Sequence, residues 1–237
     1  SYCFIGAKNL ERVIPLLYFI NQVLHIFQIN IQTVVAITPK YKIENGITSI
    51  SATKLLIFGD HNLQNLNAAK LVCNQLGLSD SEFYHKIKTF KGASNRLELI
   101  RKINNSCIYK DFAHSPSKLK ATSSAMKKQF PGRTLVACIE LHTFSSLNKK
   151  FLQQYEGSMV APDQAIVYFN PKAIAHKKLE AITKEQVYDA FKREDLIVFT
   201  KSEKLERHLM SLNWKHQNLL MMSSGNFNGL DFKNIIK

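Results

Sequence analysis

The sequence predicts an α/β protein whose C-terminal part is a doubly wound, mostly parallel sheet. From about Phe90 onward, short apolar runs alternate with segments of helical periodicity. Several of the helical segments begin at Ser, Thr or Pro residues that favour a helix start. No apolar run approaches the roughly 20 residues of a transmembrane helix. Together these observations favour strand–helix–strand units in a protein without a membrane span.

The apolar residues before Phe90 follow a different pattern. From Ser1 to about Thr53, short apolar runs favour strands with short connections; they are Val13–Ile20, Val23–Ile29 and Thr33–Ile37. Lys54–Phe58 is the next predicted strand. A helix follows, in which Leu66, Ala69, Val72, Cys73 and Leu76 repeat at helical spacing, and Gly77 is its natural stop. We expect a boundary in the polar stretch Thr89–Asn95, between domains at residues 1–89 and 90–237.

Five strands are predicted after that boundary. They are Cys107–Phe112, Thr134–Ile139, Ala165–Phe169, Leu196–Phe199 and Leu219–Met222. Four helices are predicted between them. The first begins at the Ser115 cap and runs to Phe130, and the second spans Leu147–Glu156 with Gly157 as its stop. The third runs from the Thr183–Gln186 capping box to Phe191, and the fourth begins at a Ser202 cap. This order is typical of a Rossmann-like, doubly wound sheet.

Composition narrows the class of protein. Hydrophobic residues are 45% of 237, the ordinary share of a globular protein, so a disordered chain is excluded. Lys and Arg number 32 against 18 Asp and Glu, a net charge of +14, which favours nucleic acid, a membrane surface or anionic metabolites as partners. The cysteines lie far apart, so we expect reduced thiols in a cytoplasmic protein and no zinc site; they are Cys3, Cys73, Cys107 and Cys138.

Polar clusters follow three of the predicted strands, where ligands bind in open α/β sheets. The first cluster holds His61, Asn62 and Asn65; the two asparagines share one helix face, and a carboxamide matches the edge of an adenine ring. The alternative is that Asn62 only caps its helix. The second cluster holds Asp111, His114 and Ser115, where a carboxylate can accept hydrogen bonds from a ribose diol, or else simply cap a turn.

The third cluster follows the Thr134–Ile139 strand and is completed by a loop after the last strand. Its members are small and polar, as a pocket for a polar substrate requires; they are Glu140, His142, Thr143, Ser145, Ser146, Ser223, Ser224, Gly225, Asn226 and Gly229. No Gly-x-Ser-x-Gly elbow surrounds a serine, which argues against a hydrolase triad. Gly-x-x-x-x-Gly-Lys-Ser/Thr and Gly-x-Gly-x-x-Gly loops are both absent from the sequence, so ATP phosphates have no cradle here.

In this order, the clusters resemble motifs of the Mur ligase family of ATP-dependent, amide-forming enzymes. Residues 59–65 with Ala68 and Ala69 resemble the family's G-x-H-N-x-x-N…A-A motif. Residues 90–98 resemble F-x-G…R-x-E, and residues 111–116 resemble D-[YF]-A-H-x-P. Residues 140–147 and 222–227 resemble the murein tripeptide ligase subfamily, with Thr143 and Ser146 where relatives that add one amino acid tend to carry arginines.

The resemblance implies roles for individual residues. Asn62 and Asn65 would hold adenine with His61 beside them, Asp111 would hold the ribose, and Arg96 would reach the nucleotide phosphates. The incoming peptide would meet a second set of residues, namely His114, His142, Ser145, Ser224 and Asn226. The implied fold is the tail of the central ATPase domain followed by the C-terminal domain. No complete catalytic set and no metal ligand are expected within the chain.

The implied reaction belongs to peptidoglycan recycling in the cytoplasm. The murein tripeptide ligase joins L-alanyl-γ-D-glutamyl-meso-diaminopimelate to UDP-N-acetylmuramate: ATP phosphorylates a carboxylate and the peptide amine then attacks. The implied cofactors are ATP and magnesium, which offsets charge on the transferring phosphoryl group. Because the phosphate loop and the magnesium ligands are missing, we expect a fragment that cannot form the acyl phosphate alone. We also expect a monomer that binds neither nucleic acid nor membrane.

Two alternative functions from other classes of protein share some of these features. A basic nucleic-acid-binding module would gather Lys and Arg on one face beside exposed aromatic rings. The lysine pairs are instead scattered through both halves of the chain, as at Lys127-Lys128, Lys149-Lys150 and Lys177-Lys178. A dinucleotide-dependent oxidoreductase has the same fold class, and the missing glycine fingerprint argues against it.

Overall fold

The computed structural model describes residues 38–236. The chain divides into two compact units, Ser1–Ala93 and Ser94–Lys237, which are described separately below. The apolar runs of residues 13–20, 23–29 and 33–37 lie outside the described residues, so their predicted strands stay predictions. Within the described part, no helix has the length and apolar character to span a membrane.

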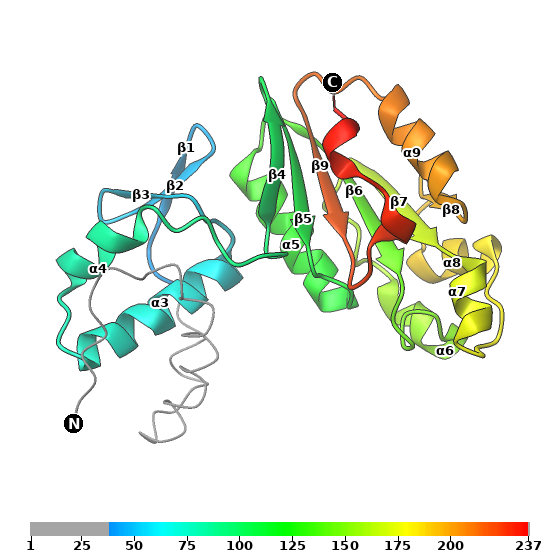
Figure 1. Cartoon of the computed structure of the whole chain (residues 1–237), viewed down its shortest axis with the longest axis horizontal. Helices are drawn as coiled ribbons and strands as arrows, with labels where there is room; N and C mark the ends of the chain where they lie inside the picture. The colour runs from blue at the N-terminus through cyan, green and yellow to red at the C-terminus, as the bar shows by residue number, and fades with distance from the viewer. Residues whose placement is uncertain (1–37, 237) are drawn as a thin grey trace. The chain divides into compact units, whose positions relative to one another are not determined.

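The first unit combines a small antiparallel sheet with two helices (Figure 1). Its elements are β1 (Lys42–Glu44), β2 (Ile47–Ile50), β3 (Thr53–Leu55), α3 (Asp60–Gln75) and α4 (Asp80–Ile87). The sheet has the order β1-β2-β3, and its buried side chains join those of both helices in one core. Gly77, at φ 89°, ends α3 as predicted, because a glycine adopts the left-handed conformation without a Cβ clash.

Two features of this unit differ from the sequence predictions. The strand predicted at Lys54–Phe58 ends at Leu55, and the chain then turns through an exposed Leu56 to reach Gly59 before α3. Helix α4 was not predicted. Its start is nevertheless encoded in the sequence: Ser79 and Glu82 form a reciprocal capping box, in which each side chain accepts the other's backbone N–H.

The second unit is built on a six-stranded sheet, and the predicted mostly parallel, doubly wound class is confirmed. The strands are β4 (Glu98–Ile103), β5 (Ser106–Asp111), β6 (Thr134–Leu141), β7 (Gln164–Phe169), β8 (Ile197–Phe199) and β9 (Gln217–Met222). Their order is β4-β5-β9-β6-β7-β8, with β4 and β8 at the two edges of the sheet (Figure 1). Only the β4–β5 hairpin is antiparallel; the other pairings in this sheet are parallel.

Helices connect the parallel strands of the second unit. They are α5 (Pro116–Gln129), α6 (Lys149–Leu152), the 3-10 turn η2 (Gln153–Tyr155), α7 (Pro171–His176), α8 (Lys184–Phe191), α9 (Ser202–Ser211), and the 3-10 turns η3 (Phe227–Gly229) and η4 (Phe232–Asn234). Helix α9 and the C-terminal segment cover one face of the sheet, where their apolar residues share a core with β5, β6, β7 and β9. Helix α5 packs against β6, and its C-terminal Phe130 meets Tyr109 of β5.

Two predicted helix starts in this unit are confirmed by the structure and two are corrected. Thr183 and Gln186 form the predicted capping box. Ser115 occupies the N-cap position before Pro116, but its side chain accepts no capping hydrogen bond. Ser202 is the first helical residue rather than the cap, which is Lys201. The helix predicted at Leu147–Glu156 is one α-helical turn capped by Asn148, which then tightens into η2.

Alternation along the strands decides which face of the sheet each residue meets. Ile108 of β5 and Cys138 of β6 belong to the core under α9. Glu140, two residues beyond Cys138, meets that same face, whereas Asp111, three residues beyond Ile108, meets the opposite one.

Burial raises the pKa of the Cys138 thiol. The described cysteines are all free thiols, as predicted, and Cys3 lies outside the described residues.

Candidate functional site

The candidate site lies at the carboxyl ends of β5, β6 and β9, which are neighbours in the sheet. Register pairs Asp111 with Met222, and Met222 with Ile139, so the chain leaves all three strands at one edge. The backbone N–H of Ser223 donates to the carbonyl oxygen of Asp111 at 3.0 Å. The fold thus brings together the predicted residues that follow these strands. We call this region the carboxyl edge.

Asp111 closes β5 with a buried carboxylate that is 2% exposed. Its Oδ1 accepts the N–H of Ala113 at 2.7 Å, and its Oδ2 accepts the N–H of Leu97 at 2.8 Å. Leu97 has φ 45°, a left-handed conformation that non-glycine residues rarely adopt, so the carboxylate holds an unusual turn in place. The turn-capping alternative therefore describes the bonds that Asp111 makes here. A ribose would have to bond to the lone pairs of the Asp111 carboxylate that Ala113 and Leu97 leave free. This contact with a ribose stays a prediction.

Arg96 lies in the turn that precedes β4. It is exposed, and its guanidinium carbon is 5.6 Å from the centroid of the Phe112 ring. The backbone N–H of Phe112 donates to the carbonyl oxygen of Asn95 at 2.8 Å, which joins this turn to the residue after Asp111. Arg96 and Asp111 are therefore neighbours in the second unit, as an interaction of both with one nucleotide requires.

His114 is held in the loop after β5 by bonds from two directions. Its Nδ1 lies 2.8 Å from the carbonyl oxygen of Phe112, and its own carbonyl oxygen accepts the Tyr155 hydroxyl at 2.6 Å. Tyr155 is fully buried and stacks on Phe191, with 5.0 Å between ring centroids. Burial raises the pKa of the Tyr155 phenol far above its ordinary range. Tyr155 thus links the loop after β5 to η2, a role that the sequence analysis did not detect.

Glu140 is the buried charged group of the carboxyl edge. The sequence analysis placed it in a polar loop, but β6 continues to Leu141 and Glu140 is 4% exposed. Its Oε2 accepts the Ser223 hydroxyl and also the backbone N–H of Phe227 at 2.9 Å. Ser223 Oγ in turn accepts the N–H of Gly225 at 2.6 Å. One carboxylate therefore organises the whole loop that follows β9.

His142 and Gly225 complete this network. His142 Nδ1 lies 3.7 Å from Glu140 Oε1, and the His142 side chain is 39% exposed. A Cβ on Gly225 would lie 2.7 Å from Glu140 Oε2 and 2.9 Å from His142 Cγ, closer than packed atoms approach. Position 225 therefore requires glycine because the carboxylate and the imidazole both pack on its backbone.

The remaining substrate-facing predictions fall on two loops of the same edge. Ser145 is exposed, with its hydroxyl 3.1 Å from that of Thr143, which accepts the N–H of Ser146. After β9, Asn226 is exposed, and Ser224 has a buried hydroxyl without a hydrogen-bond partner among the described residues. Ser145 and Asn226 are thus accessible to a ligand, and the Ser224 hydroxyl has unused bonding capacity.

The adenine-binding residues predicted from the sequence all lie on α3, in the first unit. Asn62 donates through Nδ2 to the carbonyl oxygen of Phe58 at 2.9 Å. The N-cap of α3 is Gly59 and no side chain caps it, so the alternative that Asn62 is the cap is wrong. His61 is half-buried and Asn65 is exposed. The convergence of Asn62 and Asp111 on one adenosine involves two units and stays a prediction.

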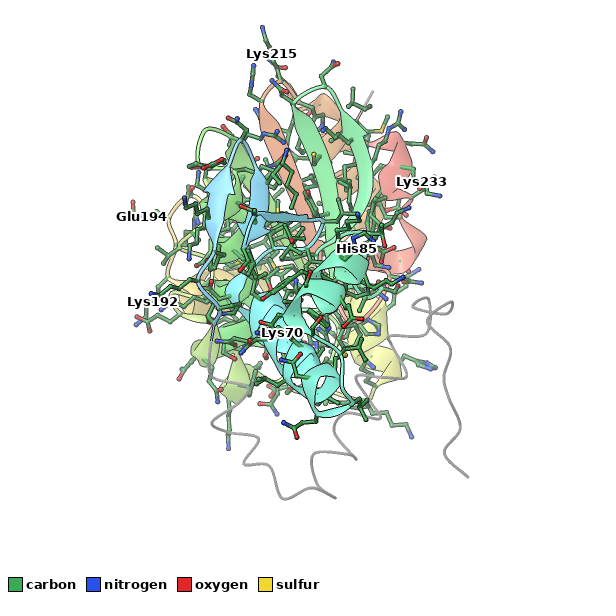
Figure 2. The ribbon with its side chains drawn as sticks, turned by 90° about the vertical axis from the view of Figure 1, so that its left-hand side faces the viewer. Lys70, His85, Lys192, Glu194, Lys215 and Lys233 are labelled. Atoms are coloured by element: carbon green, nitrogen blue, oxygen red, sulfur yellow. The ribbon has the colours of Figure 1, made fainter. Side chains whose placement is uncertain are left out.

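Basic side chains of the second unit point in different directions. In Figure 2, Lys192, Lys215 and Lys233 extend from three separate sides of that unit, and Glu194 lies beside Lys192. Acidic partners neutralise others: Lys127 bonds Asp163 at 2.7 Å and Lys192 bonds Glu156 at 2.9 Å. This distribution differs from the single basic stripe of a nucleic-acid-binding module.

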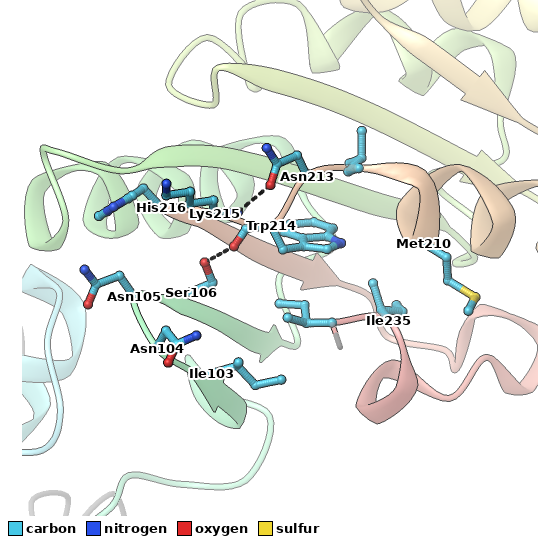
Figure 3. A pocket seen from close by; sticks show the side chains of 12 residues that line it. Ile103, Asn104, Asn105, Ser106, Met210, Asn213, Trp214, Lys215, His216 and Ile235 are labelled. Carbon is cyan, nitrogen blue, oxygen red and sulfur yellow. Dashed lines mark hydrogen bonds between the residues drawn. The ribbon is translucent and has the colours of Figure 1, made fainter.

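A cavity of about 530 Å³ lies at the opposite end of the sheet, where β5 and β9 begin; we call this the amino edge. Figure 3 shows its apolar side chains, among them Ile103, Met210, Trp214 and Ile235. The Ser106 hydroxyl donates to the carbonyl oxygen of Trp214 and holds that segment against the sheet (Figure 3). None of the sequence-predicted site residues lines this cavity.

Sequence comparisons find relatives of this chain among known proteins. No protein-family model matches the chain. The UDP-N-acetylmuramate–L-alanine ligase of Caldicellulosiruptor bescii is 35% identical over 150 residues, which are 63% of this chain and 32% of that protein. The enzyme of the same name from Caldicellulosiruptor saccharolyticus is 29% identical over 177 residues, which are 74% of this chain and 38% of that protein. The chain thus spans about a third of the length of these relatives.

Solved structures show the same fold. The UDP-N-acetylmuramate–alanine ligase of Thermotoga maritima superposes with a TM-score of 0.62 at 15% identity, covering 80% of this chain and 42% of that one. A murein peptide ligase from Psychrobacter arcticus gives a TM-score of 0.51 at 22% identity, covering 77% and 39%. The MurF ligase of Thermotoga maritima, solved in complex with ADP, gives 0.56 at 18% identity, covering 79% and 42%. The chain is therefore a homologue of the Mur ligases, and its second unit has the mostly parallel α/β fold of their C-terminal domain.

Proposed function

We propose that this chain supplies the C-terminal, substrate- and nucleotide-binding part of an ATP-dependent amide ligase of peptidoglycan metabolism, acting in the cytoplasm as a monomer. Residues 1–89 would be the tail of the central ATPase domain and residues 90–237 the C-terminal domain. The observation that carries the proposal is the carboxyl edge, where Asp111, Glu140 and Ser223 lie at the ends of adjacent strands. Open α/β sheets bind their ligands at this edge.

The nucleotide would be held by polar groups from both units. Asn62 and Asn65 would hold the adenine, Asp111 the ribose, and Arg96 the phosphates. The exposed guanidinium of Arg96, which lies over the ring of Phe112, the residue that follows Asp111, supports this part of the proposal. The chain contains no phosphate loop, and no three His, Cys, Asp or Glu side chains gather as metal ligands among the described residues. The proposal assigns no magnesium ligand to the described residues.

The second substrate would be a peptide, in our proposal L-alanyl-γ-D-glutamyl-meso-diaminopimelate, which is joined to UDP-N-acetylmuramate. His142, Ser145, Ser224 and Asn226 would contact it, with His114 nearby. The buried unpartnered hydroxyl of Ser224 and the exposed Ser145 and Asn226 support this assignment. Ser145, Ser224 and Asn226 carry short, uncharged polar side chains that can donate and accept hydrogen bonds, which suits the carboxylate and ammonium groups of such a peptide.

Calorimetry on this chain tests the peptide assignment. We expect the diaminopimelate tripeptide to bind more tightly than the same peptide with lysine in its third position. The variant Asn226→Ala should weaken binding about tenfold, the loss of one or two hydrogen bonds. The control Asn213→Ala, at the amino edge, should bind as the wild type does. Equal heats for both peptides, or no heat at all, would remove the tripeptide from the proposal.

An ATPase assay tests the assignment of the chain to one part of the ligase. With UDP-N-acetylmuramate, tripeptide and ATP all present, we expect this chain alone to release no phosphate, because no residue segment here can cradle the transferring phosphoryl group. Phosphate release that depends on both substrates would contradict this part of the proposal and show that the chain is a complete catalyst.

A further inference from the structure

The carboxyl edge holds a carboxylate–imidazole pair to which the assignments above give no chemical role. Glu140 is 4% exposed, yet both of its oxygens face polar groups of the carboxyl edge. Oε2 is occupied by the Ser223 hydroxyl and the Phe227 N–H, so Oε1 is the oxygen directed towards His142 Nδ1, at 3.7 Å. A carboxylate in this position favours the tautomer in which Nδ1 carries the proton.

The backbone of Gly225 also limits where the imidazole can lie. The backbone of Gly225 packs so closely on the ring that an added Cβ would lie 2.9 Å from Cγ and 3.0 Å from Nδ1. Gly225 is itself held by the Ser223 hydroxyl, which is bonded to Glu140. The ring therefore packs against two groups that belong to one hydrogen-bonded unit, so a change in Glu140 would alter both the nearby carboxylate and the loop segment that contacts the ring.

The outer edge of the ring remains available for chemistry. With the proton on Nδ1, Nε2 keeps its lone pair, and no hydrogen bond to Nε2 is present among residues 94–236. The side chain is 39% exposed and lies in the loop with Ser145, and Gly225, which packs against the ring, stands between Ser224 and Asn226 in the sequence. A neutral imidazole with a free Nε2, oriented by a carboxylate, is the arrangement that accepts a proton from a nucleophile.

We propose that His142, positioned by Glu140, accepts the proton of the incoming amine during amide formation. The inference rests on the proposed function, because it needs an acyl phosphate and a peptide amine as reactants. The amine nitrogen forms the C–N bond with its lone pair, and the C–O bond to phosphate breaks with its electron pair leaving on the phosphate. One N–H proton moves to Nε2 of His142. Glu140 keeps its position and stabilises the imidazolium that results.

NMR spectroscopy of this chain, labelled with 15N in its histidines, tests the inference without requiring turnover. At a pH where the ring is neutral, we expect wild-type His142 to carry its proton on Nδ1. The amide of Glu140→Gln would present an N–H₂ group to Nδ1, so we expect the proton to move to Nε2 in that variant. His216→Asn, at the amino edge, is the control: it should remove one set of ring signals and leave those of His142 unchanged.

Adding the tripeptide then separates the inference from the proposed function. We expect the Nε2 signal of wild-type His142 to shift with the free-amine peptide and not with its N-acetylated form, and we expect Glu140→Gln to lose this difference. If backbone signals of Ser224 and Asn226 shift while Nε2 does not, peptide binding stands and the inference is overturned. If the peptide shifts no signal, the proposed function fails and the inference with it. A wild-type Nε2–H tautomer overturns the inference even if the variant does not fold.

Discussion

The two ends of the six-stranded sheet are built on opposite principles. The carboxyl edge holds a buried carboxylate whose Oε2 accepts hydrogen bonds from Ser223 and Phe227, and Gly225 packs closely against it. The amino edge holds a cavity of about 530 Å³ with a mainly apolar floor around Trp214. The cavity at the amino edge is thus lined by none of the predicted site residues, whereas the carboxyl edge carries several of them. Fixed polar groups that are held by buried partners mark the candidate site better than volume does.

The topology explains this difference. In parallel strands every chain leaves the sheet at the carboxyl edge to begin a loop or helix, so polar loops gather there. The chain enters at the amino edge through short turns, such as residues 104–105 between β4 and β5. Such turns leave apolar side chains of the neighbouring elements partly uncovered. Stability measurements on matched variants of the two edges can break or sharpen this comparison.

Removing the buried carboxylate should have the largest effect. Glu140→Ala leaves the Ser223 hydroxyl and the Phe227 N–H without their acceptor in a buried site, so we expect a loss of about 3 kcal/mol in the free energy of unfolding. Urea unfolding followed by the fluorescence of Trp214, the one tryptophan of the sequence, measures this. Glu194→Ala, at an exposed position, should change stability by less than about 0.5 kcal/mol. Equal losses in both variants would remove Glu140 from its organising role.

A methyl group added to each edge gives the second test. Gly225→Ala places a Cβ 2.7 Å from Glu140 Oε2, so we expect a loss of about 2 kcal/mol together with weaker tripeptide binding. The matched variant is Gly132→Ala, just before β6 at the amino edge, where no atom lies within 4 Å of the new Cβ. That variant should be neutral or slightly more stable. A Gly225→Ala protein as stable as Gly132→Ala would show that the carboxyl edge is not tightly packed.

Sequence reasoning found the strands of the parallel sheet because each is a compact apolar run between turn signals. It missed β4, in which a bulge between Leu99 and Arg101 interrupts the alternation of burial and whose residues include Arg101 and Lys102. It also misjudged Glu140. A charged residue after an apolar run is typical of the start of a loop. In the structure β6 continues to Leu141, and the Glu140 carboxylate is buried against Ser223, which lies 83 residues further along the chain.

The residues of the candidate site fall into two groups: those that local sequence patterns indicate, and the partners that hold them in place. Asp111, His142 and Ser224 could be proposed as site residues because they lie at or just after predicted strand ends, and strand ends can be located from the sequence. The partners that hold them could not, since Tyr155 reaches His114 over a separation of 41 residues and Leu97 reaches Asp111 over 14. Such contacts depend on how helices return to the sheet, which local patterns do not encode. The closeness of Gly225 to Glu140 is a further contact of this kind.

Loosening the amino edge should have a smaller and purely structural effect. Ser106 is 2% exposed; its hydroxyl donates to the Trp214 carbonyl oxygen and accepts the N–H of Gln217 at 3.3 Å. We expect Ser106→Ala to cost about 1 kcal/mol, the usual worth of such a bond, and to leave tripeptide affinity unchanged. Urea unfolding and calorimetry on the same sample measure both quantities. A loss of peptide affinity in Ser106→Ala would show that the two edges are coupled.

The smallest expected effect concerns Asp163, which precedes β7 at the amino edge. Partial burial opposes its ionisation, but the Lys127 ammonium at 2.7 Å and the Leu135 N–H at 2.6 Å outweigh that and lower the pKa of Asp163 below its ordinary 3.8. An Asp with a lowered pKa stabilises the fold above its ordinary pKa, and this contribution is lost as pH falls through the lowered value. The wild type should therefore lose stability relative to Asp163→Asn below about pH 4 and hold a constant advantage at neutral pH. Because the side chain is 44% exposed, solvent screening limits that advantage to about 0.5 kcal/mol. Unfolding curves at pH 3 and pH 7 for both proteins measure it, and a difference that does not depend on pH would show that the ion pair adds nothing to the amino edge.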